Sequence, residues 1–540
     1  ASVTAAAAPL LEVRDLRIAL PAGSARGHAL QGLSISLGRG QTLGVVGASG
    51  AGKSTLALSL LGLLPRALRV SAGKVLLEGE DLLRATPARL RALRAARMSM
   101  LFAQPAAALD PLMTCGEQID ELLQRRTRLT RNQRRDKTLA LLEEAQASEP
   151  ARIAASLPQG IAVSERQRVL IAMALALDPA LLVADEPTHS LDPADQAQIL
   201  ALLREASRRR GMALLFTSRD IGVAADVAQR LAVLHEGVLV EAGPREELQQ
   251  HARHEVTQYL LAAFAAPPPE RSPEPHAALV LSVQDLSKSY RQRLAFAERR
   301  EAQAVRGASF EVRRGQTLAV VGATGAGKST LARCVVRLET PTAGSIRLGQ
   351  DEIARVGASH LRPLRRRMQW LSDDAPHALD ARRTIVDSML EGPLNFGMPR
   401  ELARERAKDL LEMVHLPARW LDRHPDRLDG ADRQRVCIAR ALMVEPELIV
   451  ADDVARPFDP DVQALLLELL DQLQRRLRFA MLFCTRELRA AVRVCDQLAV
   501  MHEGELVEQG PLRRVLDAPQ HECTRALIAA APEGGLAFAR

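Results

Sequence analysis

The chain of 540 residues carries the same glycine-rich motif twice, and this duplication constrains its fold more than any other feature. Residues 47–54 read GASGAGKS and residues 322–329 read GATGAGKS. Other segments recur in the same order, with RQRV at 166–169 and 433–436 and HEG at 235–237 and 502–504. Solenoid repeats are only about 20–50 residues long, so a repeat of this length indicates a duplicated domain.

A proline-rich segment separates the two copies. Residues 264–278 read FAAPPPERSPEPHAA, and prolines favour an extended, semi-rigid spacer. We therefore expect a first domain at 1–263, a linker at 264–278 and a second domain at 279–540. Within each copy, β-rich stretches such as 42–46 and 181–184 alternate with helical periodicity such as 194–208. This alternation predicts an α/β fold, with a mostly parallel sheet flanked by helices in each domain.

Composition is that of a soluble globular protein, with 47% apolar and 25% charged residues. No stretch approaches the roughly 18 uninterrupted apolar residues of a membrane span, so we expect a cytoplasmic location. The net charge of +7 could suit a nucleic-acid partner, but the arginines are spread along the chain and aromatic residues make up only 3%. That composition is poor for base stacking, and we expect no nucleic-acid partner, since an anionic nucleotide or a membrane surface explains the charge equally well.

Each glycine-rich motif follows an apolar strand and precedes a helical stretch, which is the context of a phosphate-binding P-loop. Glycines let backbone N–H groups turn inward around the phosphates, the lysine supplies charge, and the serine hydroxyl ligates Mg²⁺. A glycine-rich turn that binds nothing is the alternative, and two matches in the same context weaken it. The candidate nucleotide contacts are Gly47, Ser49, Gly50, Ala51, Gly52, Lys53, Ser54 and Thr55, and Gly322, Thr324, Gly325, Ala326, Gly327, Lys328, Ser329 and Thr330.

Acidic residues end an apolar strand in each copy. Asp185 and Asp452 are placed to hold Mg²⁺ together with the P-loop serines Ser54 and Ser329. The next residue in the first copy, Glu186, can polarise the attacking water. In the second copy that position is Asp453, whose carboxylate should fall about 1 Å short, and such a misplacement can cost about 10²-fold in rate. A solvated strand end is a weak alternative for the first pair and a stronger one for the second.

These motifs together resemble the ABC transporter ATPase family along nearly all of both halves. LDPLMT at 109–114 with GEQ at 116–118, RRRMQ at 365–369, and HEVT at 254–257 with HECT at 521–524, where the family commonly has HPYT, resemble the oligopeptide, dipeptide and nickel importer branch. The fused microcin and peptide importer ATPases are the most similar arrangement. The resemblance implies ATP and Mg²⁺ as ligands and a peripheral position at the cytoplasmic face of the bacterial inner membrane. It also implies two membrane-spanning permease subunits as partners and, indirectly, an extracytoplasmic solute-binding protein.

In this family the two ATPase domains pair head to tail, so that each ATP lies between one P-loop and the signature of the other domain, usually LSGGQ. Here residues 161–165 read IAVSE and residues 428–432 read LDGAD. Ala162, Val163, Asp429 and Ala431 should therefore remove a donor, add bulk or add like charge near the γ-phosphate. The glutamine that senses Mg²⁺ and the membrane subunit is also altered.

Ala103 stands at that glutamine position in the first copy, with Gln104 one place late, and Asp373 stands there in the second. The switch histidine is replaced by Arg219 and Arg486. Both arginines could bind the γ-phosphate with their forked donors, or equally they could point to solvent.

An aromatic residue for stacking on adenine survives as Tyr290, while the first copy has Leu20. We predict that ATP and Mg²⁺ still bind while hydrolysis is slow, with the Glu186 site the one that turns over. The leading interpretation is a motor subunit of an importer for peptides or related small solutes. The alternatives are a nucleotide-gated regulatory or scaffold protein and a tandem ATPase acting on ribosomes or DNA.

Overall fold

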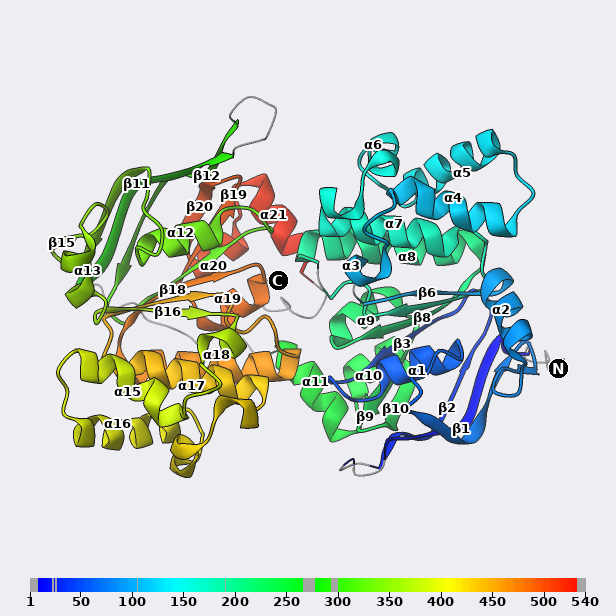
Figure 1. Cartoon of the computed structure of the whole chain (residues 1–540), viewed down its shortest axis with the longest axis horizontal. Helices are drawn as coiled ribbons and strands as arrows, with labels where there is room; N and C mark the ends of the chain where they lie inside the picture. Colours follow the sequence, from blue (N-terminus) through cyan, green and yellow to red (C-terminus); the bar gives the residue numbers. More distant parts are fainter. Residues whose placement is uncertain are drawn as a thin grey trace. The chain divides into compact units, whose positions relative to one another are not determined.

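The computed structural model describes residues 8–21, 24, 27–103, 105–189, 191–265, 277–292 and 300–531. The chain divides into two compact units, the first ending at Ala263 and the second beginning at Phe264, with the short segment 192–194 assigned to the second. Figure 1 shows that each unit contains sheets flanked by helices. Most of the predicted linker falls at residues 266–276, outside the described residues.

A six-stranded sheet lies at the centre of the first unit, in the order β10-β9-β3-β8-β7-β6, and only β10 is antiparallel to its neighbour. Every residue of β3 and β7 is buried, as expected for parallel strands covered on both faces. The strands are β3 (Thr42–Val46), β6 (Met98–Leu101), β7 (Leu181–Asp185), β8 (Ala213–Ser218), β9 (Arg230–His235) and β10 (Val238–Pro244).

A smaller antiparallel sheet, in the order β2-β1-β4-β5, completes the strands of the first unit. Leu16 of this sheet, Val45 of β3 and Leu56 of the first helix belong to one buried cluster, so the antiparallel sheet, the parallel sheet and this helix share a core. The strands are β1 (Leu11–Ala19), β2 (His28–Leu37), β4 (Arg69–Leu77) and β5 (Glu80–Asp81).

The chain between β6 and β7 forms a helical subdomain in which α4 and α5 contact each other and both contact α6 and α7. Capping boxes fix the starts of α4 and α5, where Thr114 pairs with Glu117 and Thr130 with Gln133. The helices of the first unit are α1 (Lys53–Leu60), α2 (Pro87–Ala96), α3 (Pro105–Ala108), α4 (Cys115–Arg126), α5 (Arg131–Glu144), α6 (Pro150–Ala155), α7 (Val163–Leu175), α8 (Pro193–Arg210), α9 (Ile221–Val227), α10 (Arg245–His251) and α11 (Glu255–Ala265).

The second unit repeats this architecture, with sheets in the orders β12-β11-β14-β15 and β16-β17-β18-β13-β19-β20. The antiparallel sheet contains β11 (Leu279–Gln292), β12 (Arg300–Arg313), β14 (Ala343–Leu348) and β15 (Asp351–Glu352), and the larger sheet contains β13 (Thr317–Val321), β16 (Met368–Ser372), β17 (Leu448–Asp452), β18 (Ala480–Thr485), β19 (Gln497–His502) and β20 (Glu505–Pro511). The helices are α12 (Lys328–Val335), α13 (Ala358–Leu364), α14 (Ala375–Ala378), α15 (Ile385–Asn395), α16 (Arg400–Met413), α17 (Gly430–Leu442), α18 (Pro460–Leu477), α19 (Leu488–Val494), α20 (Leu512–Asp517) and α21 (Glu522–Ala529). The predicted α/β class is confirmed in both units.

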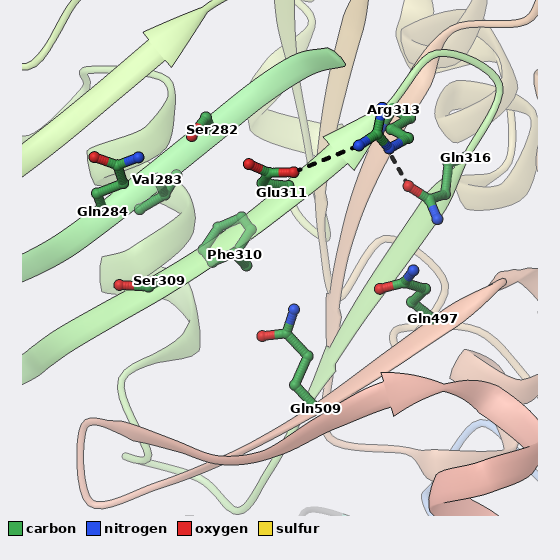
Figure 2. A pocket seen from close by; sticks show the side chains of 10 residues that line it. All are labelled: Ser282, Val283, Gln284, Ser309, Phe310, Glu311, Arg313, Gln316, Gln497 and Gln509. Atoms are coloured by element: carbon green, nitrogen blue, oxygen red, sulfur yellow. Dashed lines mark hydrogen bonds and ion pairs between the residues drawn. The ribbon is translucent and has the colours of Figure 1, made fainter. Parts of the chain in front are cut away.

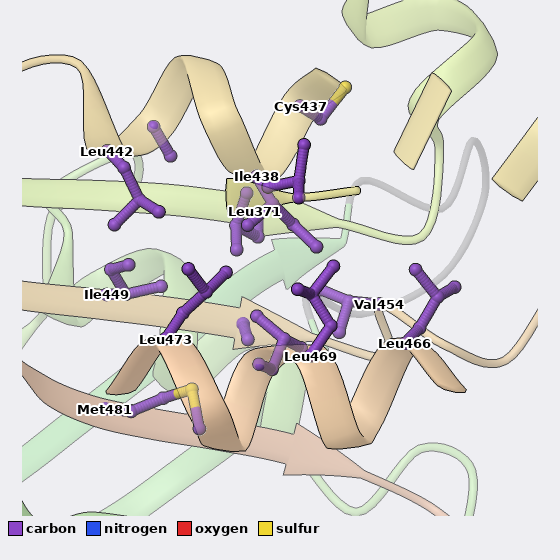
Figure 3. Close-up of a cluster of buried hydrophobic side chains, with 14 of the residues drawn as sticks. Leu371, Cys437, Ile438, Leu442, Ile449, Val454, Leu466, Leu469, Leu473 and Met481 are labelled. Carbon is purple, nitrogen blue, oxygen red and sulfur yellow. The ribbon is translucent and has the colours of Figure 1, made fainter. Parts of the chain in front are cut away.

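The core of the second unit lies on both faces of its parallel sheet. Ala319 and Val321 of β13 face one buried cluster, and Leu318 and Val320 face another, because side chains alternate along a strand. Figure 3 shows the first cluster, in which side chains of α17 and α18 pack against β16, β17 and β18. None of the described helices is both long and apolar enough to span a lipid bilayer.

Candidate nucleotide-binding sites

The predicted site residues of the first unit meet at one edge of the parallel sheet. Strand β8 lies between β3 and β7, with Val46 opposite Ser218 and Thr217 opposite Asp185. The P-loop follows β3, Arg219 follows β8 and Glu186 follows β7. Because the carboxyl ends of parallel strands share one edge, these three segments are neighbours, as in other open α/β sheets that bind ligands there.

The first P-loop has the backbone geometry of a phosphate cradle. Gly52 has a φ of +105°, and a Cβ at this residue would lie 2.8 Å from the carbonyl oxygen of Ala29. The Lys53 ammonium donates to the carbonyl oxygens of Gly47 at 2.7 Å and Ala48 at 3.0 Å. Helix α1 begins at this lysine, so its N-terminus points at the loop and favours an anion there.

The second P-loop repeats this geometry. Gly327 also has a φ of +105°, and a Cβ there would lie 2.1 Å from the carbonyl oxygen of Ala304. Lys328 donates to the carbonyl oxygens of Gly322 at 2.7 Å and Ala323 at 2.8 Å. Burial lowers the pKa of Lys328, because the charged form is poorly solvated. A phosphate bound in this loop would favour the charged form.

The acidic pair of the first unit belongs to a buried polar network. The Asp185 carboxylate accepts a hydrogen bond from the Thr217 hydroxyl at 2.7 Å. Glu186 has a φ of +43°, which is uncommon for a residue with a side chain and occurs often at functional sites. Its Oε1 lies 3.2 Å from Lys53 Nζ and its Oε2 2.8 Å from Arg219 Nε. One carboxylate therefore contacts both Lys53, which was predicted to bind the phosphates, and Arg219, for which the sequence left a γ-phosphate contact and exposure to solvent equally open.

The second unit brings the corresponding residues together in a different pattern. The Ser329 hydroxyl donates to Asp452 at 3.1 Å, so two predicted Mg²⁺ ligands are adjacent. Asp453 has a φ of +50°, and its Oδ2 accepts from Arg486 Nε at 3.2 Å. Nη1 of the same arginine donates to the Thr324 hydroxyl of the P-loop at 2.9 Å. In both units the switch-position arginine binds the neighbouring carboxylate rather than pointing to solvent.

Asp452, a predicted metal ligand of the second unit, has two other carboxylates, Asp453 and Asp373, near enough to affect its charge. Burial, with Asp453 and Asp373 nearby, raises the pKa of Asp452 to about 6, although the Ser329 hydroxyl bond opposes this shift. Burial also raises the pKa of Asp373, and Arg456, 3.8 Å away, opposes it. In the described part of the chain, no cluster of three or more His, Cys, Asp or Glu side chains could hold a metal without other ligands. The adjacent Ser329 hydroxyl and Asp452 carboxylate are oxygen ligands of the kind that suits Mg²⁺, which usually combines one or two carboxylates with phosphate oxygens and water.

The positions predicted to replace the metal-sensing glutamine differ between the units. Ala103 is partly buried just after β6, and Gln104 lies outside the described residues. Asp373 follows β16 and supplies a carboxylate where the family has an amide.

Tyr290 lies on β11 beside the second P-loop helix. Its hydroxyl hydrogen-bonds the side chains of Thr330 and Glu339, and Lys288 Nζ lies 5.0 Å from the ring centroid. Leu20, at the equivalent place in the first unit, is only partly buried.

The altered signature of the second unit has a role that the sequence did not reveal. Asp429 is the N-cap of α17, and its carboxylate accepts from the backbone N–H of Asp432 at 2.8 Å. Burial and the Asp429 charge raise the pKa of Asp432. In the first unit, Ala162 precedes α7 without a side-chain cap. Aspartate is one of the preferred residues at helix N-caps, and this preference could have predicted the contact from the sequence.

The HEVT motif anchors the C-terminal helix of its unit. Glu241 of β10 accepts from the backbone N–H groups of Arg253 at 2.9 Å and His254 at 3.2 Å, and the His254 ring accepts from the Val256 N–H at 3.2 Å. Glu508 and His521 repeat this arrangement in the second unit. In the described residues, the motif therefore holds the start of the C-terminal helix against the preceding strand.

A polar hollow of about 500 Å³ in the second unit lies apart from the nucleotide site. Gln316, which precedes β13, and Gln497, which begins β19, place it at the amino ends of these strands, whereas the P-loop follows the carboxyl end of β13. Figure 2 shows Gln509 extending from its strand towards Phe310 and Glu311. The full lining is Ser282, Val283, Gln284, Ser309, Phe310, Glu311, Arg313, Gln316, Gln497 and Gln509.

The fold and the paired P-loops define a tandem P-loop nucleotide-binding protein. The ABC transporter family matches residues 30–189 and 305–456. The glutathione import ATP-binding protein GsiA of Shigella sonnei (strain Ss046) is 36% identical over 557 aligned residues, covering 97% of this chain and 89% of that protein, and GsiA of Escherichia coli (strain K12) gives the same values. Among solved structures, the dimeric ATP-binding cassette MJ0796 bound to ADP and Pi is 25% identical with a TM-score of 0.40, covering 44% of this chain and 98% of that one. The chain therefore belongs to the ABC transporter family and is an ABC-type ATPase, as the sequence resemblance predicted.

Proposed function

We propose that this chain is the ATP-binding motor subunit of an importer for peptides or related small solutes. The observation that carries the proposal is the P-loop cradle, which occurs in both units. In each unit the P-loop lysine, Lys53 or Lys328, lies at the edge of the sheet where a neighbouring strand ends in an aspartate. The relatives named as glutathione import ATP-binding proteins support import and the solute class. The partners are two membrane-spanning permease subunits and, through them, an extracytoplasmic solute-binding protein. The chain works at the cytoplasmic face of the inner membrane.

Both sites are proposed to bind ATP with Mg²⁺. When bound, Mg²⁺ supplies positive charge that neutralises the phosphate tail. Ser54 with Asp185, and Ser329 with Asp452, are the proposed ligands, and their hydroxyl and carboxylate oxygens are of the kind that Mg²⁺ prefers. The lysines bind the phosphates, and Glu186 orients and polarises the attacking water.

We propose that the domains 1–263 and 279–540, joined by the linker 264–278, pair head to tail when ATP binds. Each P-loop would then meet the signature segment of the other domain. Hydrolysis is slow in this proposal, because Asp429 already caps α17 with a carboxylate where the family presents a neutral serine to the γ-phosphate. The same cap favours, as a second candidate, a nucleotide-gated regulator that binds ATP without turnover.

Phosphate release with Mg²⁺-ATP tests the proposal, measured beside a Lys53→Ala/Lys328→Ala double variant and a direct nucleotide titration. We expect slow turnover above the double variant and saturable binding that the double variant loses. Binding without turnover would favour the regulator, and the absence of binding would refute both candidates. A fast turnover that Glu186→Gln abolishes would contradict slow hydrolysis. Copurification with permease subunits checks the importer assignment.

A further inference from the structure

The polar hollow of the second unit has a counterpart in the first unit, built from the equivalent strands. The hollow, of about 500 Å³, is lined mainly by β11, β12, β19 and β20. The counterpart, of about 330 Å³, is lined mainly by β1, β2, β9 and β10. Side chains that differ between the two linings are therefore particular to one unit, whereas the hollow itself belongs to the fold.

An internal ion pair occupies the lining of the first unit. Arg14 Nε donates to Glu12 Oε1 at 2.7 Å, and Nη2 donates to Oε2 at 2.8 Å. Two parallel bonds of this kind satisfy one edge of a guanidinium and a whole carboxylate together. The charged groups of Glu12 and Arg14 are therefore matched to each other rather than to a ligand.

The second unit carries its charges on the neighbouring strand, where they are less well matched. Ser282 and Gln284 of β11 stand in place of the paired glutamate and arginine of β1. On β12, Arg313 Nη1 donates to the carbonyl oxygen of Ala277 at 3.1 Å, which fixes the guanidinium. Its Nη2 lies 3.8 Å from Glu311 Oε2, too far for a direct hydrogen bond. Both charged groups therefore keep hydrogen-bonding capacity for a ligand.

Carboxamide side chains provide much of the remaining polar lining. Gln497 and Gln509 occupy the positions of Arg230 and Ala242 in the first unit, and Figure 2 shows both on strands of the larger sheet, opposite β12. Among the described residues, the amide groups of Gln284, Gln497 and Gln509 make no hydrogen bond within the chain. A carboxamide can both donate and accept. These groups can therefore bond to a polar, uncharged part of a ligand in either sense.

We propose that this hollow binds a free α-amino acid with a polar, uncharged side chain. The α-ammonium and α-carboxylate groups of such a molecule share one carbon atom, so they can contact Glu311 and Arg313, whose charged groups lie 3.8 Å apart, at the same time. The formal charges of the lining cancel, which matches a zwitterion rather than an anion or a cation. The glutamine amides then bond to the polar side chain. A volume of about 500 Å³ is within the usual range for small-molecule sites.

L-glutamine is the probe, in a saturation-transfer NMR titration of the whole chain, and we expect saturable binding. N-acetyl-L-glutamine lacks the ammonium charge and L-glutaminamide lacks the carboxylate. Each should bind at least about 10-fold more weakly, because each loses a charge-assisted hydrogen bond. L-norleucine keeps both charges and should bind at least about 5-fold more weakly, because its side chain cannot bond to the amides.

Substitutions taken from the first unit locate the site. Gln497→Arg with Gln509→Ala introduces the residues that the first unit carries at these positions, so the strands should keep their fold. L-glutamine should bind to this variant at least about 10-fold more weakly. Glu311→Gln, at an exposed position, should have a similar effect. Arg230→Gln is the matched control in the first unit and should leave the affinity unchanged, because the pair formed by Glu12 and Arg14 remains.

The absence of saturable L-glutamine binding to the folded wild-type chain would overturn the proposal. Equal affinity for L-glutamine and L-norleucine would overturn the assigned side-chain class. Wild-type affinity in both hollow variants, with folding checked by circular dichroism, would overturn the location. The Lys53→Ala/Lys328→Ala double variant should bind L-glutamine as the wild type does, since the hollow and the P-loop lie at opposite ends of β13, and loss of binding there would also count against the hollow.

Discussion

Asp452→Asn should stabilise the nucleotide-free protein, and the gain should grow with pH. Burial and two neighbouring carboxylates raise the pKa of Asp452 to about 6 from its ordinary value of 3.8. The folded protein therefore binds this proton more tightly than the unfolded chain does. The stability that the proton contributes is complete below about pH 4 and is lost as the pH rises through about 6. Asparagine keeps the shape of the side chain and never carries the charge.

The size of the effect follows from the shift. About two pKa units correspond to about 3 kcal/mol at pH 8, and relaxation of the neighbouring carboxylates should reduce this to about 1–3 kcal/mol. At pH 4 the wild-type carboxyl group is protonated in most folded molecules, so the gain should fall to about 0.5 kcal/mol. The hydrogen bond from Ser329 should survive, because the asparagine carbonyl oxygen can also accept it.

Tryptophan fluorescence isolates the unit in question, because both tryptophans, Trp370 and Trp420, lie in the second unit. Trp370 lies on β16, opposite Val450 of the strand that ends at Asp452. Urea unfolding in EDTA without nucleotide, at pH 8 and pH 4, gives the free energies of unfolding. Asp409→Asn, on the exposed face of α16, is the matched control and should change little. Equal stability of the wild type and Asp452→Asn at pH 8, or a gain independent of pH, would refute the reasoning.

Three further predictions concern residues that bind a carboxylate, a base or a helix end. Arg219→Ala should lower kcat about 10-fold or more with little change in KM, because Glu186 loses the guanidinium that positions it. Arg219→Lys should recover part of the rate. A variant that loses affinity for ATP but not for ADP would instead indicate that Arg219 contacts the γ-phosphate. Tyr290→Ala should weaken nucleotide binding at the second site by about 5–100-fold, because it removes the ring predicted to stack on adenine, and Tyr290→Phe should retain most of the affinity in the same direct nucleotide titration. Asp429→Ser should raise steady-state phosphate release, because serine keeps the N-cap and removes the carboxylate, and an unchanged rate would show that the cap does not limit turnover.

The repeated units and their P-loops could be predicted from the sequence because their constraints are local. A glycine at position 52 or 327 is required by a φ of +105° and by the carbonyl oxygen that a Cβ would meet, and this requirement appears directly as a residue type. The parallel strands are similarly local, since β3 and β13 are buried throughout and apolar after the threonine that begins each. The α/β class therefore followed from pattern and order alone.

The contacts of the switch-position arginines could not be predicted, because they depend on three strands that are distant in sequence. The sequence showed only that Arg219 replaces a histidine, and it left the choice between phosphate and solvent open. The structure gives a third partner, Glu186, because the left-handed backbone at this residue turns its carboxylate towards both β8 and the P-loop. With a shorter side chain and a similar backbone angle, Asp453 pairs with Arg486, and Lys328 donates to the carbonyl oxygens of Gly322 and Ala323. The difference of one methylene between Glu186 and Asp453 is visible in the sequence, but its effect on these contacts depends on a left-handed backbone angle that the sequence does not show.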